Sequence, residues 1–256
     1  MVLSAIISDI HGNMQALEAV VVDARREGAE RFYCLGDIVG YGAQPVECLE
    51  IVREISSVTI QGNHEYAVLH GPAGFNRLAS EAVFWTRRQL EAGSTGMTDG
   101  LDYIGGLGDR ADLEQCTLVH GSPRHPRDEY LFREDTIEFL PQRQDFSSKL
   151  EGCFQLIDQP CFVGHTHVPG VIDDTWHWVA PAGCPDGYDT EGRACLVNVG
   201  SVGQPRDGNH GASYALFDGK TVQFRRVTYD VASAARRIFD EADLPDMLGQ
   251  RLLEAW

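Results

Sequence analysis

The sequence predicts an α/β fold in which a strand–helix repeat is followed by a strand-rich half. Three observations lead to this prediction. The first 65 residues contain short apolar, β-branched runs, amphipathic segments separate these runs, and a series of short strand candidates follows from Cys116 onwards. Strands that alternate with helices are joined by right-handed crossovers and pair mainly in parallel. The first half is therefore expected to form a largely parallel sheet.

The strand–helix repeat is defined by changes of hydrophobic period. Apolar residues of the first helix candidate recur at helical spacing, and Gly28 supplies its stop signal. The predicted elements of this half are strands at Val2–Ser8, Arg31–Leu35 and Ser57–Ile60 and helices at Gly12–Glu27 and Pro45–Ile55.

The rest of the chain has weaker signals. A helix is expected at Asn76–Gln89, a loop at Ala92–Gly100, and helices at Val231–Ala242 and after Pro245, while Arg133–Leu156 shows helical signals without clear bounds. The strand candidates are Cys116–Val119, Pro160–Val163, Val168–Val179, Ala194–Val199, Ser213–Phe217 and Val222–Thr228.

Length and composition favour one globular domain over residues 1–256, since no repeat, linker or low-complexity tract interrupts the chain. We see no signal peptide and no apolar run of about 20 residues, so a soluble cytoplasmic protein is expected and a membrane partner is not. Seven scattered cysteines without a C-x-x-C pair indicate small core residues in a reducing compartment. Oligomeric state leaves no trace in the sequence.

The formal net charge of −17 argues against nucleic acid as the main partner, because binding a phosphate backbone requires clustered Lys and Arg. A small phosphate ester is also an anion. Bound cations would remove this conflict, because they are the largest local charges in such a site.

Polar side chains directly follow five of the predicted strands. They are Asp9 and His11, then Asp37, Asn63 with His64, His120, and finally His165 with His167. Ligands bind at the carboxyl ends of strands in α/β sheets, so we expect these groups to converge. Each motif alone is explained equally well by an Asx turn or a helix cap. Five of them at strand ends indicate one shared site.

The chemistry of these groups indicates a two-metal centre. Two carboxylates, four imidazoles and one carboxamide oxygen suit two divalent or trivalent ions such as Mn, Fe or Zn. A structural zinc site would use cysteines, and none is spaced for it. One carboxylate can bridge two ions about 3.5–4 Å apart, which is the arrangement found in phosphatases and nucleases.

The same motifs, in the same order, resemble the signature of calcineurin-like metallophosphoesterases. The matching segments are Asp9-Ile-His11, Gly36-Asp37-Ile-Val-Gly40, Gly62-Asn63-His64-Glu65, His120-Gly-Ser-Pro123 and Gly164-His165-Thr-His167. Residues 198–206 also resemble the stretch that closes the site in small prokaryotic members. The resemblance implies a four-layer α/β/β/α sandwich with a binuclear metal site at the carboxyl ends of the strands.

The resemblance also implies a role for each residue. Asp9, His11 and His167 would hold one metal, whereas Asn63, His120 and His165 would hold the other. Asp37 would bridge the two ions and is a catalytic residue in this sense. His64 would be the general acid or a contact to the phosphate, unless it only orients the site. Asn63 would also contact the substrate, and Asn13 and Glu65 would be supporting residues.

The expected reaction is hydrolysis of a phosphodiester, a phosphomonoester or a nucleotide, with a phosphodiesterase favoured. A hydroxide that bridges the two ions would attack phosphorus, and His64 would protonate the leaving oxygen. Gly-x-Ser-x-Gly, a Walker A sequence and Gly-x-Gly-x-x-Gly are all missing, so a serine nucleophile, a P-loop and a Rossmann turn are unsupported.

The substrate is less well defined than the metal site. In protein Ser/Thr phosphatases of the superfamily, the Gly-Asp motif continues into Asp-Arg-Gly, whose arginine binds phosphate. Here the corresponding residues are Gly40-Tyr41-Gly42, so this arginine is missing. Its absence argues against protein phosphatase activity and makes a symmetrical dinucleoside tetraphosphatase less expected. Arg124, His125, Arg127 and Arg206 are candidate phosphate contacts, although each also reads as a plain surface residue. Residues 76–92 or 124–150 could form a lid. A catalytically weak metal-binding scaffold of the same fold, a protein phosphatase-like activity and a nuclease remain as alternatives.

Overall fold

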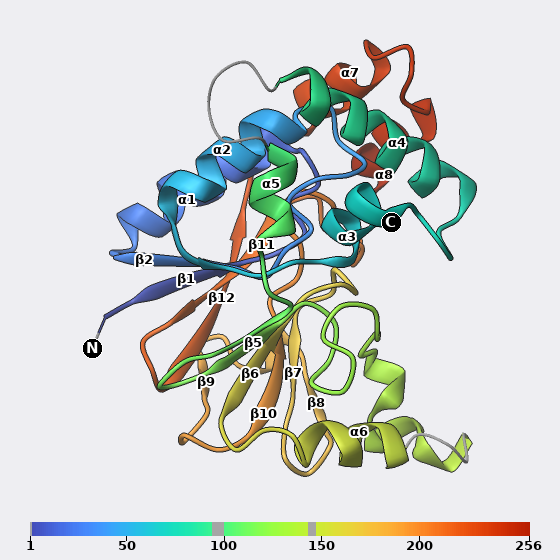
Figure 1. The fold of residues 1–256 in the computed structure, drawn as a ribbon. Coiled ribbons are helices and arrows are strands. Elements are labelled where there is room, and N and C mark those ends of the chain that lie inside the picture. Colours follow the sequence, from blue (N-terminus) through green and yellow to red (C-terminus); the bar gives the residue numbers. More distant parts are fainter. Residues whose placement is uncertain (1, 94–99, 143–146) are drawn as a thin grey trace.

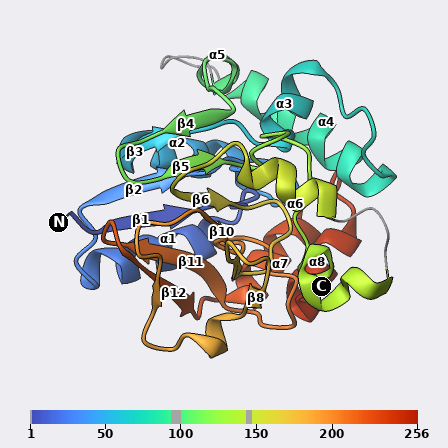
Figure 2. The same ribbon diagram turned by 90° about the horizontal axis from the view of Figure 1, so that it is seen from below.

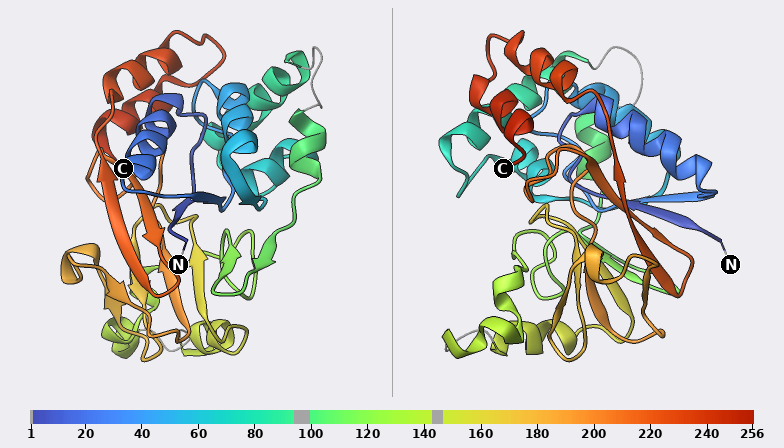
Figure 3. Two further views of the ribbon diagram at one scale, coloured as in Figure 1. Left: turned by 90° about the vertical axis from the view of Figure 1, so that its left-hand side faces the viewer. Right: turned by 180° about the vertical axis from the view of Figure 1, so that it is seen from behind.

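The computed structural model describes residues 2–93, 100–142 and 147–256. In these residues two six-stranded sheets pack face to face, and helices cover the outer face of each sheet (Figures 1 and 3). This arrangement confirms the predicted four-layer α/β/β/α sandwich. No helix in the described ranges is both long enough and apolar enough to cross a bilayer.

The first sheet contains the three strands of the N-terminal repeat and three strands from the end of the chain. In spatial order it consists of β3 (Ser56–Thr59), β2 (Arg31–Cys34), β1 (Ser4–Ile7), β11 (Ala212–Phe217), β12 (Thr221–Val227) and β9 (Tyr188–Asp189). Strands β1 to β3 are parallel, as predicted, but β11 and β12 pair antiparallel. The sheet is mixed because a C-terminal hairpin needs no crossover helix and can pair against β1 directly.

The second sheet comes from the middle of the chain. In spatial order it consists of β4 (Arg110–Asp112), β5 (Thr117–Val119), β6 (Pro160–Val163), β10 (Cys195–Asn198), β7 (Gly170–Ile172) and β8 (Trp178–Val179). The single strand predicted at Val168–Val179 is wrong: it is a hairpin of β7 and β8. The turn forms because the Asp173 carboxylate accepts the backbone N–H groups of Thr175 and His177. Strands β4 and β9 were missed because they are short and lack an apolar run.

Most helices lie where the periodicity placed them. The α-helices are α1 (Met14–Arg26), α2 (Pro45–Ile55), α3 (Asn63–His70), α4 (Arg77–Ala92), α5 (Gly100–Gly105), α6 (Ser147–Phe154), α7 (Val231–Phe239) and α8 (Asp246–Glu254), and the 3₁₀ turns are η1 (Arg133–Asp135), η2 (Ile137–Gln142) and η3 (Pro181–Gly183). The weak signals in Arg133–Leu156 thus correspond to η1, η2 and α6. Most of the loop predicted at Ala92–Gly100 lies outside the described residues.

Three apolar layers hold the sandwich together. The layer between the sheets includes Ile6, Leu118 and Phe162, all fully buried. A second layer packs α1 and α2 on the outer face of the first sheet. A third packs α6 on the outer face of the second sheet, the side seen in Figure 2. Burial of this kind supplies the main stabilising free energy of folding, and it fixes the strand ends that carry the polar residues.

Candidate metal centre

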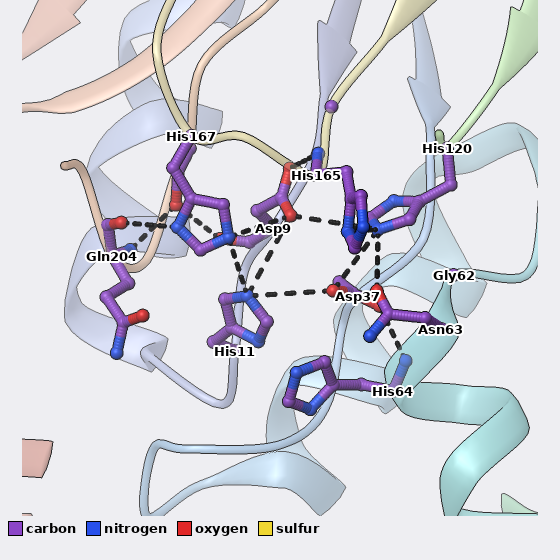
Figure 4. Close-up of polar contacts among 12 residues, drawn as sticks. Asp9, His11, Asp37, Gly62, Asn63, His64, His120, His165, His167 and Gln204 are labelled. Atoms are coloured by element: carbon purple, nitrogen blue, oxygen red, sulfur yellow. Dashed lines mark hydrogen bonds and ion pairs between the residues drawn. The ribbon is translucent and has the colours of Figure 1, made fainter. Parts of the chain in front are cut away.

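The structure brings the predicted ligands together at one edge of the sandwich (Figure 4). Asp9 and His11 follow β1, Asp37 follows β2, and Asn63 begins α3 just after β3. From the other sheet, His120 follows β5, and His165 and His167 follow β6. The site therefore lies where the carboxyl ends of strands from both sheets meet.

The first group of ligands consists of Asp9, His11 and His167. The Nε2 atoms of His11 and His167 lie 3.2 Å apart. Asp9 Oδ1 is 3.1 Å from His167 Nε2 and 3.8 Å from His11 Nε2. All three side chains are buried, and they could hold one metal ion together.

The second group surrounds His120. Its Nε2 atom lies 3.1 Å from Asn63 Oδ1, 3.2 Å from His165 Nδ1 and 3.2 Å from Asp37 Oδ2. The same Asp37 oxygen is 3.8 Å from His11 Nε2 in the first group. Asp37 thus lies between the two groups, in the position that a bridging carboxylate requires.

The hydrogen bonds of three imidazoles determine which nitrogen faces the site. The Nδ1 atoms of His11, His120 and His167 lie 3.1, 3.0 and 2.6 Å from the carbonyl oxygens of Val39, Leu35 and Gln204. A carbonyl can only accept, so each Nδ1 carries a proton, and in the neutral imidazole the Nε2 atom is the one that presents a lone pair. A histidine that binds a metal through one ring nitrogen usually donates a hydrogen bond from the other, as the Nδ1 atoms do here.

The spacing of these lone pairs fits metal ions. Metal–nitrogen bonds of about 2.0–2.1 Å place neighbouring ligands of one ion about 3.0–3.4 Å apart. The distances given for each group match this spacing, except the 3.8 Å between Asp9 Oδ1 and His11 Nε2. Without a cation or proton between them, the facing lone pairs of His11 and His167 would repel each other. Asp9 Oδ1 is also buried, and within the described part of the chain it has no hydrogen-bond partner. The residues present therefore fit a binuclear centre.

Burial and neighbouring charges set the ionisation of these groups. Burial lowers the pKa of His11 well below its usual range and that of His165 to about 3, so both imidazoles are neutral and available as ligands. For Asp37, burial acts to raise the pKa, but His120 and His64 outweigh it and hold the pKa well below its usual range. For His120, burial acts to lower the pKa, but the Asp37 charge raises it to about 9. A metal ion would displace that proton.

The ligand-bearing loops adopt a rare backbone conformation. Five non-glycine ligands have positive φ angles: Asp9 (54°), His11 (49°), Asp37 (52°), His165 (66°) and His167 (64°). This conformation is unfavourable for residues with a Cβ and persists only where the surroundings enforce it. Hydrogen bonds between the loops do so here: the amides of Asp9 and His11 donate to the carbonyls of Gly36 and Asp37 at 3.1 and 2.9 Å.

Glu65 holds the Asp37 loop against the start of α3. Its fully buried carboxylate accepts the backbone N–H groups of Asp37 and Gly62 at one oxygen and those of Ile38 and Val39 at the other, at 2.8–3.1 Å. Gly62 must be glycine, because a Cβ there would lie 2.2 Å from Asp37 Oδ1. These contacts leave Asp37 Oδ1 free to accept the His64 amide at 2.8 Å.

An open cavity of about 550 Å³ lies over the ligands and includes His64 and Arg206 in its lining. The His64 ring lies between the rings of Tyr41 and Phe75, at 4.6 and 5.0 Å. Its Nδ1 atom is buried and finds no hydrogen-bond partner in residues 2–93, 100–142 and 147–256. The first residues of α4 border the cavity, but the apolar face of this helix packs on α7 and α8 as ordinary core. Asp128 and Tyr130 also line the cavity.

Two of the predicted phosphate contacts do not line this cavity. Arg124 forms an ion pair with Glu129 at 3.4 Å and points toward α6. Arg127 pairs with Asp109 at 3.4 Å and covers the ring of Tyr66 at 3.9 Å. His125, the third residue of that segment, does not line the cavity either. Carboxylates already occupy both arginines, so only Arg206 remains as a candidate phosphate contact.

The comparison with known families agrees with this geometry. A family model described as the calcineurin-like phosphoesterase superfamily domain matches residues 2–221. The chain belongs to this superfamily. Every ligand described above falls within the matched range, whereas α7 and α8 lie beyond it. The chain is thus a metallophosphoesterase by family.

Individual relatives extend over the whole chain. An uncharacterized protein of Methanocaldococcus jannaschii is 36% identical over 253 residues, which cover 97% of this chain and 96% of the relative. The crystal structure of a metallophosphoesterase from Sphaerobacter thermophilus is 36% identical, with a TM-score of 0.81, and covers 100% of this chain and 99% of its own. A hypothetical protein from Pyrococcus horikoshii OT3, 22% identical with a TM-score of 0.73 and 98% coverage of both chains, shares the fold.

One histidine of this phosphoesterase is oriented differently from the others. The His165 Nε2 atom is buried and has no hydrogen-bond partner among the residues that the structure describes, and its Nδ1 atom faces His120 Nε2 at 3.2 Å. Instead the ring of Tyr130 stacks on His165, with 3.7 Å between ring centres and 20° between the planes. Tyr130 in turn stacks on Phe132 at 5.1 Å. Tyr130 is not recognisable as a site residue from the sequence, because a lone tyrosine ten residues beyond His120 belongs to no motif.

Proposed function

We propose that the chain hydrolyses a small phosphate ester with the help of two metal ions. The observation that carries this proposal is the double set of lone pairs at ligand spacing, with Asp37 shared between the two sets. When bound, two ions would activate water and neutralise charge on the phosphate. Asp9, His11 and His167 would hold one ion. Asn63, His120 and His165 would hold the other.

The remaining groups of the cavity would act on the ester. Asn63 and His64 border the space above Asp37, and Arg206 lines the same cavity. We assign Arg206 to neutralising phosphate charge, because a guanidinium presents paired donors that match phosphate oxygens. His64 would meet the leaving oxygen, either as the acid that gives it a proton or as a hydrogen-bond donor that positions it. Mn, Fe and Zn all suit this ligand set.

The first test combines metal content with turnover. The protein is stripped with chelator, reloaded separately with Mn, Fe or Zn, and assayed on bis-p-nitrophenyl phosphate and p-nitrophenyl phosphate. We expect two ions per chain and faster turnover of the diester. Faster turnover of the monoester would instead indicate a phosphatase. Two bound ions without turnover of either ester would favour the metal-binding scaffold.

A pair of matched variants tests the shared carboxylate. Asp37→Asn should lose metal and at least about 100-fold in kcat/KM, since even outer-sphere changes at metal sites cost 10–100-fold. Asp112→Asn makes the same chemical change at an exposed ion pair with Arg110 and serves as the control. If Asp37→Asn kept both its metal content and its turnover, the bridging assignment would be wrong.

A leaving-group series separates the two roles of His64. If His64 gives up a proton, His64→Ala should lose far more rate on esters with a high-pKa alcohol than on p-nitrophenyl esters. If His64 only positions the phosphate, the loss should be the same across the series. A variant as active as the wild type on every ester would exclude both roles.

A further inference from the structure

The loop between His120 and Tyr130 is closed by hydrogen bonds of its own residues. The buried Ser122 hydroxyl donates to the Glu129 carboxylate at 2.5 Å and accepts the backbone N–H group of His125 at 3.1 Å. Since His120 is a candidate metal ligand, this loop connects Tyr130 to the site through a short and internally bonded stretch of chain. These bonds limit how far Tyr130 can move relative to the ligands.

Stacking fixes the orientation of the Tyr130 ring. Its centre lies 3.7 Å from that of His165 and 5.1 Å from that of Phe132, and the ring planes differ by only 20° and 6°. Stacked rings at these distances attract each other. Because His165 is itself a candidate ligand, the Tyr130 ring has a defined place beside the second group of ligands. The stacking involves the ring and makes no use of the hydroxyl.

The Tyr130 hydroxyl is available to a molecule bound over the site. Tyr130 lines the open cavity of about 550 Å³ together with Asp37, His64 and Arg206, and it is 40% exposed. No described residue hydrogen-bonds this hydroxyl. A phenol keeps its proton at neutral pH, since its ordinary pKa is about 10. The hydroxyl can therefore donate a hydrogen bond into the cavity.

Charged groups of the site act on the Tyr130 phenol. Burial raises its pKa, the positive charge of Arg206 lowers it, and the negative charges of Asp37 and Asp9 raise it. Coulomb interactions weaken with distance, so this influence shows that the phenol oxygen lies on the side of the ligands and of Arg206. An anion that neutralises its charge at the same ligands would thus come within the field in which the phenol lies.

Tyr130 and His64 stand beside different groups of ligands. The His64 ring is 4.7 Å from the ring of His11, in the first group, whereas Tyr130 stacks on His165, in the second. A phosphate group bound at both proposed ions would therefore meet His64 beside the first group and the phenol beside the second. The two side chains would contact different oxygens of the same ester.

We propose that Tyr130 is a further catalytic residue, whose phenol donates a hydrogen bond to a non-bridging oxygen of the bound phosphate group. The proton stays on the phenol oxygen, so the contact orients the phosphate and stabilises its charge but transfers nothing. A donor that is fixed before the substrate binds stabilises developing charge without reorganisation. This inference rests on the proposed function, which places the phosphate group at the ligands.

The test is Tyr130→Phe, which removes the hydroxyl and keeps the stacked ring. This variant should retain the metal content of the wild type. It should bind inorganic phosphate at least about tenfold more weakly, measured by calorimetry on the metal-loaded protein, because a hydrogen bond to a charged acceptor is worth about that factor. Its kcat/KM should fall by one and the same factor on esters of low-pKa and high-pKa alcohols, since the contact is to a non-bridging oxygen. Tyr188→Phe makes the same change at a half-buried tyrosine of β9, outside this cavity, and should match the wild type.

A second measurement follows the phenol in the wild type. The zinc-loaded protein is labelled with carbon-13 at the ζ position of its eight tyrosines, and inorganic phosphate is added. The largest change of chemical shift should belong to the signal that Tyr130→Phe lacks. Tyr130→Trp, which keeps a large aromatic ring, identifies this signal if Tyr130→Phe does not fold.

Each outcome bears on the contact. Unchanged phosphate affinity in Tyr130→Phe with both ions bound would overturn it, as would a wild type that binds no phosphate or a largest shift at another tyrosine. Loss of ions from Tyr130→Phe would also count against it, because the hydroxyl would then serve the metal site. Turnover of bis-p-nitrophenyl phosphate by the wild type reports on the proposed function separately. Turnover that is equal in Tyr130→Phe would remove the contact and leave the hydrolase, whereas phosphate binding that depends on Tyr130, without turnover of any ester, would do the reverse.

Discussion

Replacing Glu65 with glutamine should destabilise the protein through the loop that carries Asp37. The carboxylate accepts four backbone N–H groups, two at each oxygen. A carboxamide keeps one accepting oxygen and turns its NH₂ group toward the other two donors. Hydrogen bonds to a charged acceptor contribute about 1.5–3 kcal/mol each, so two lost bonds correspond to about 3–6 kcal/mol.

The loss of charge offsets part of this cost. Burial and the charge of Asp37 raise the pKa of Glu65 to about 7, which means that the folded protein disfavours the ionised form of this carboxylate. The net loss should therefore lie near the lower end, at about 3 kcal/mol, which is a large part of the roughly 5–15 kcal/mol that stabilises a typical domain. For a chain of this size it corresponds to a decrease in Tm of about 6–12 °C.

Urea unfolding in the presence of chelator measures the loss without a contribution from metal. Glu81→Gln is the matched control, since Glu81 forms an exposed pair with Arg77 at 2.9 Å that is worth at most about 0.5 kcal/mol. A lower midpoint with an unchanged m-value would report a true loss of stability. If Glu65→Gln and Glu81→Gln unfolded at the same urea concentration, the four hydrogen bonds would not hold the Asp37 loop as we describe.

Three further predictions concern the metal site. Tyr130→Ala should retain fewer ions after dialysis, because the His165 ring loses its stacking partner, whereas Tyr130→Phe should retain them; equal metal content in both variants would exclude this role. Gly164→Ala places a Cβ 2.5 Å from Asp9 Oδ2 and should cost about 1–3 kcal/mol and weaken metal binding, while Gly183→Ala, whose Cβ meets nothing closer than 3.6 Å, should behave as the wild type. Chelation should lower Tm and reloading should restore it, since a ligand at 100 times its Kd adds about 2.7 kcal/mol; a Tm independent of metal would argue against bound ions.

The strand ends of the site were predictable because they depend on local signals. An apolar run that ends in Asp, His or Asn indicates both a buried strand and its edge, and parallel strands bring these edges together. The same reasoning failed for β4 and β9, which are short and polar and are held by pairing with β5 and β12. It also failed for Val168–Val179, where the side chain of Asp173 turns the chain back on itself.

The contacts around the site were less predictable because they join distant parts of the chain. The sequence shows that Arg124, Arg127 and Arg206 can each bind phosphate, but not that Glu129 and Asp109 pair with the first two. Likewise Glu65 is recognisable as part of a motif, whereas its four hydrogen bonds depend on how α3 meets the loop after β2. Tertiary packing decides which charges are left free.

Each proposed ion would take ligands from both sheets, and this has a consequence for how the protein opens. His11 and His167 are 156 residues apart in the chain, as are Asp9 and His165. An ion held between such groups acts as a cross-link, comparable to a disulfide that closes a long loop and stabilises by about 4–5 kcal/mol. Loss of metal should therefore let the two sheets separate at this edge first. Hydrogen exchange in the metal-free protein should then quicken at the ends of β1 and β6 before it quickens at the ends of the strands far from the site.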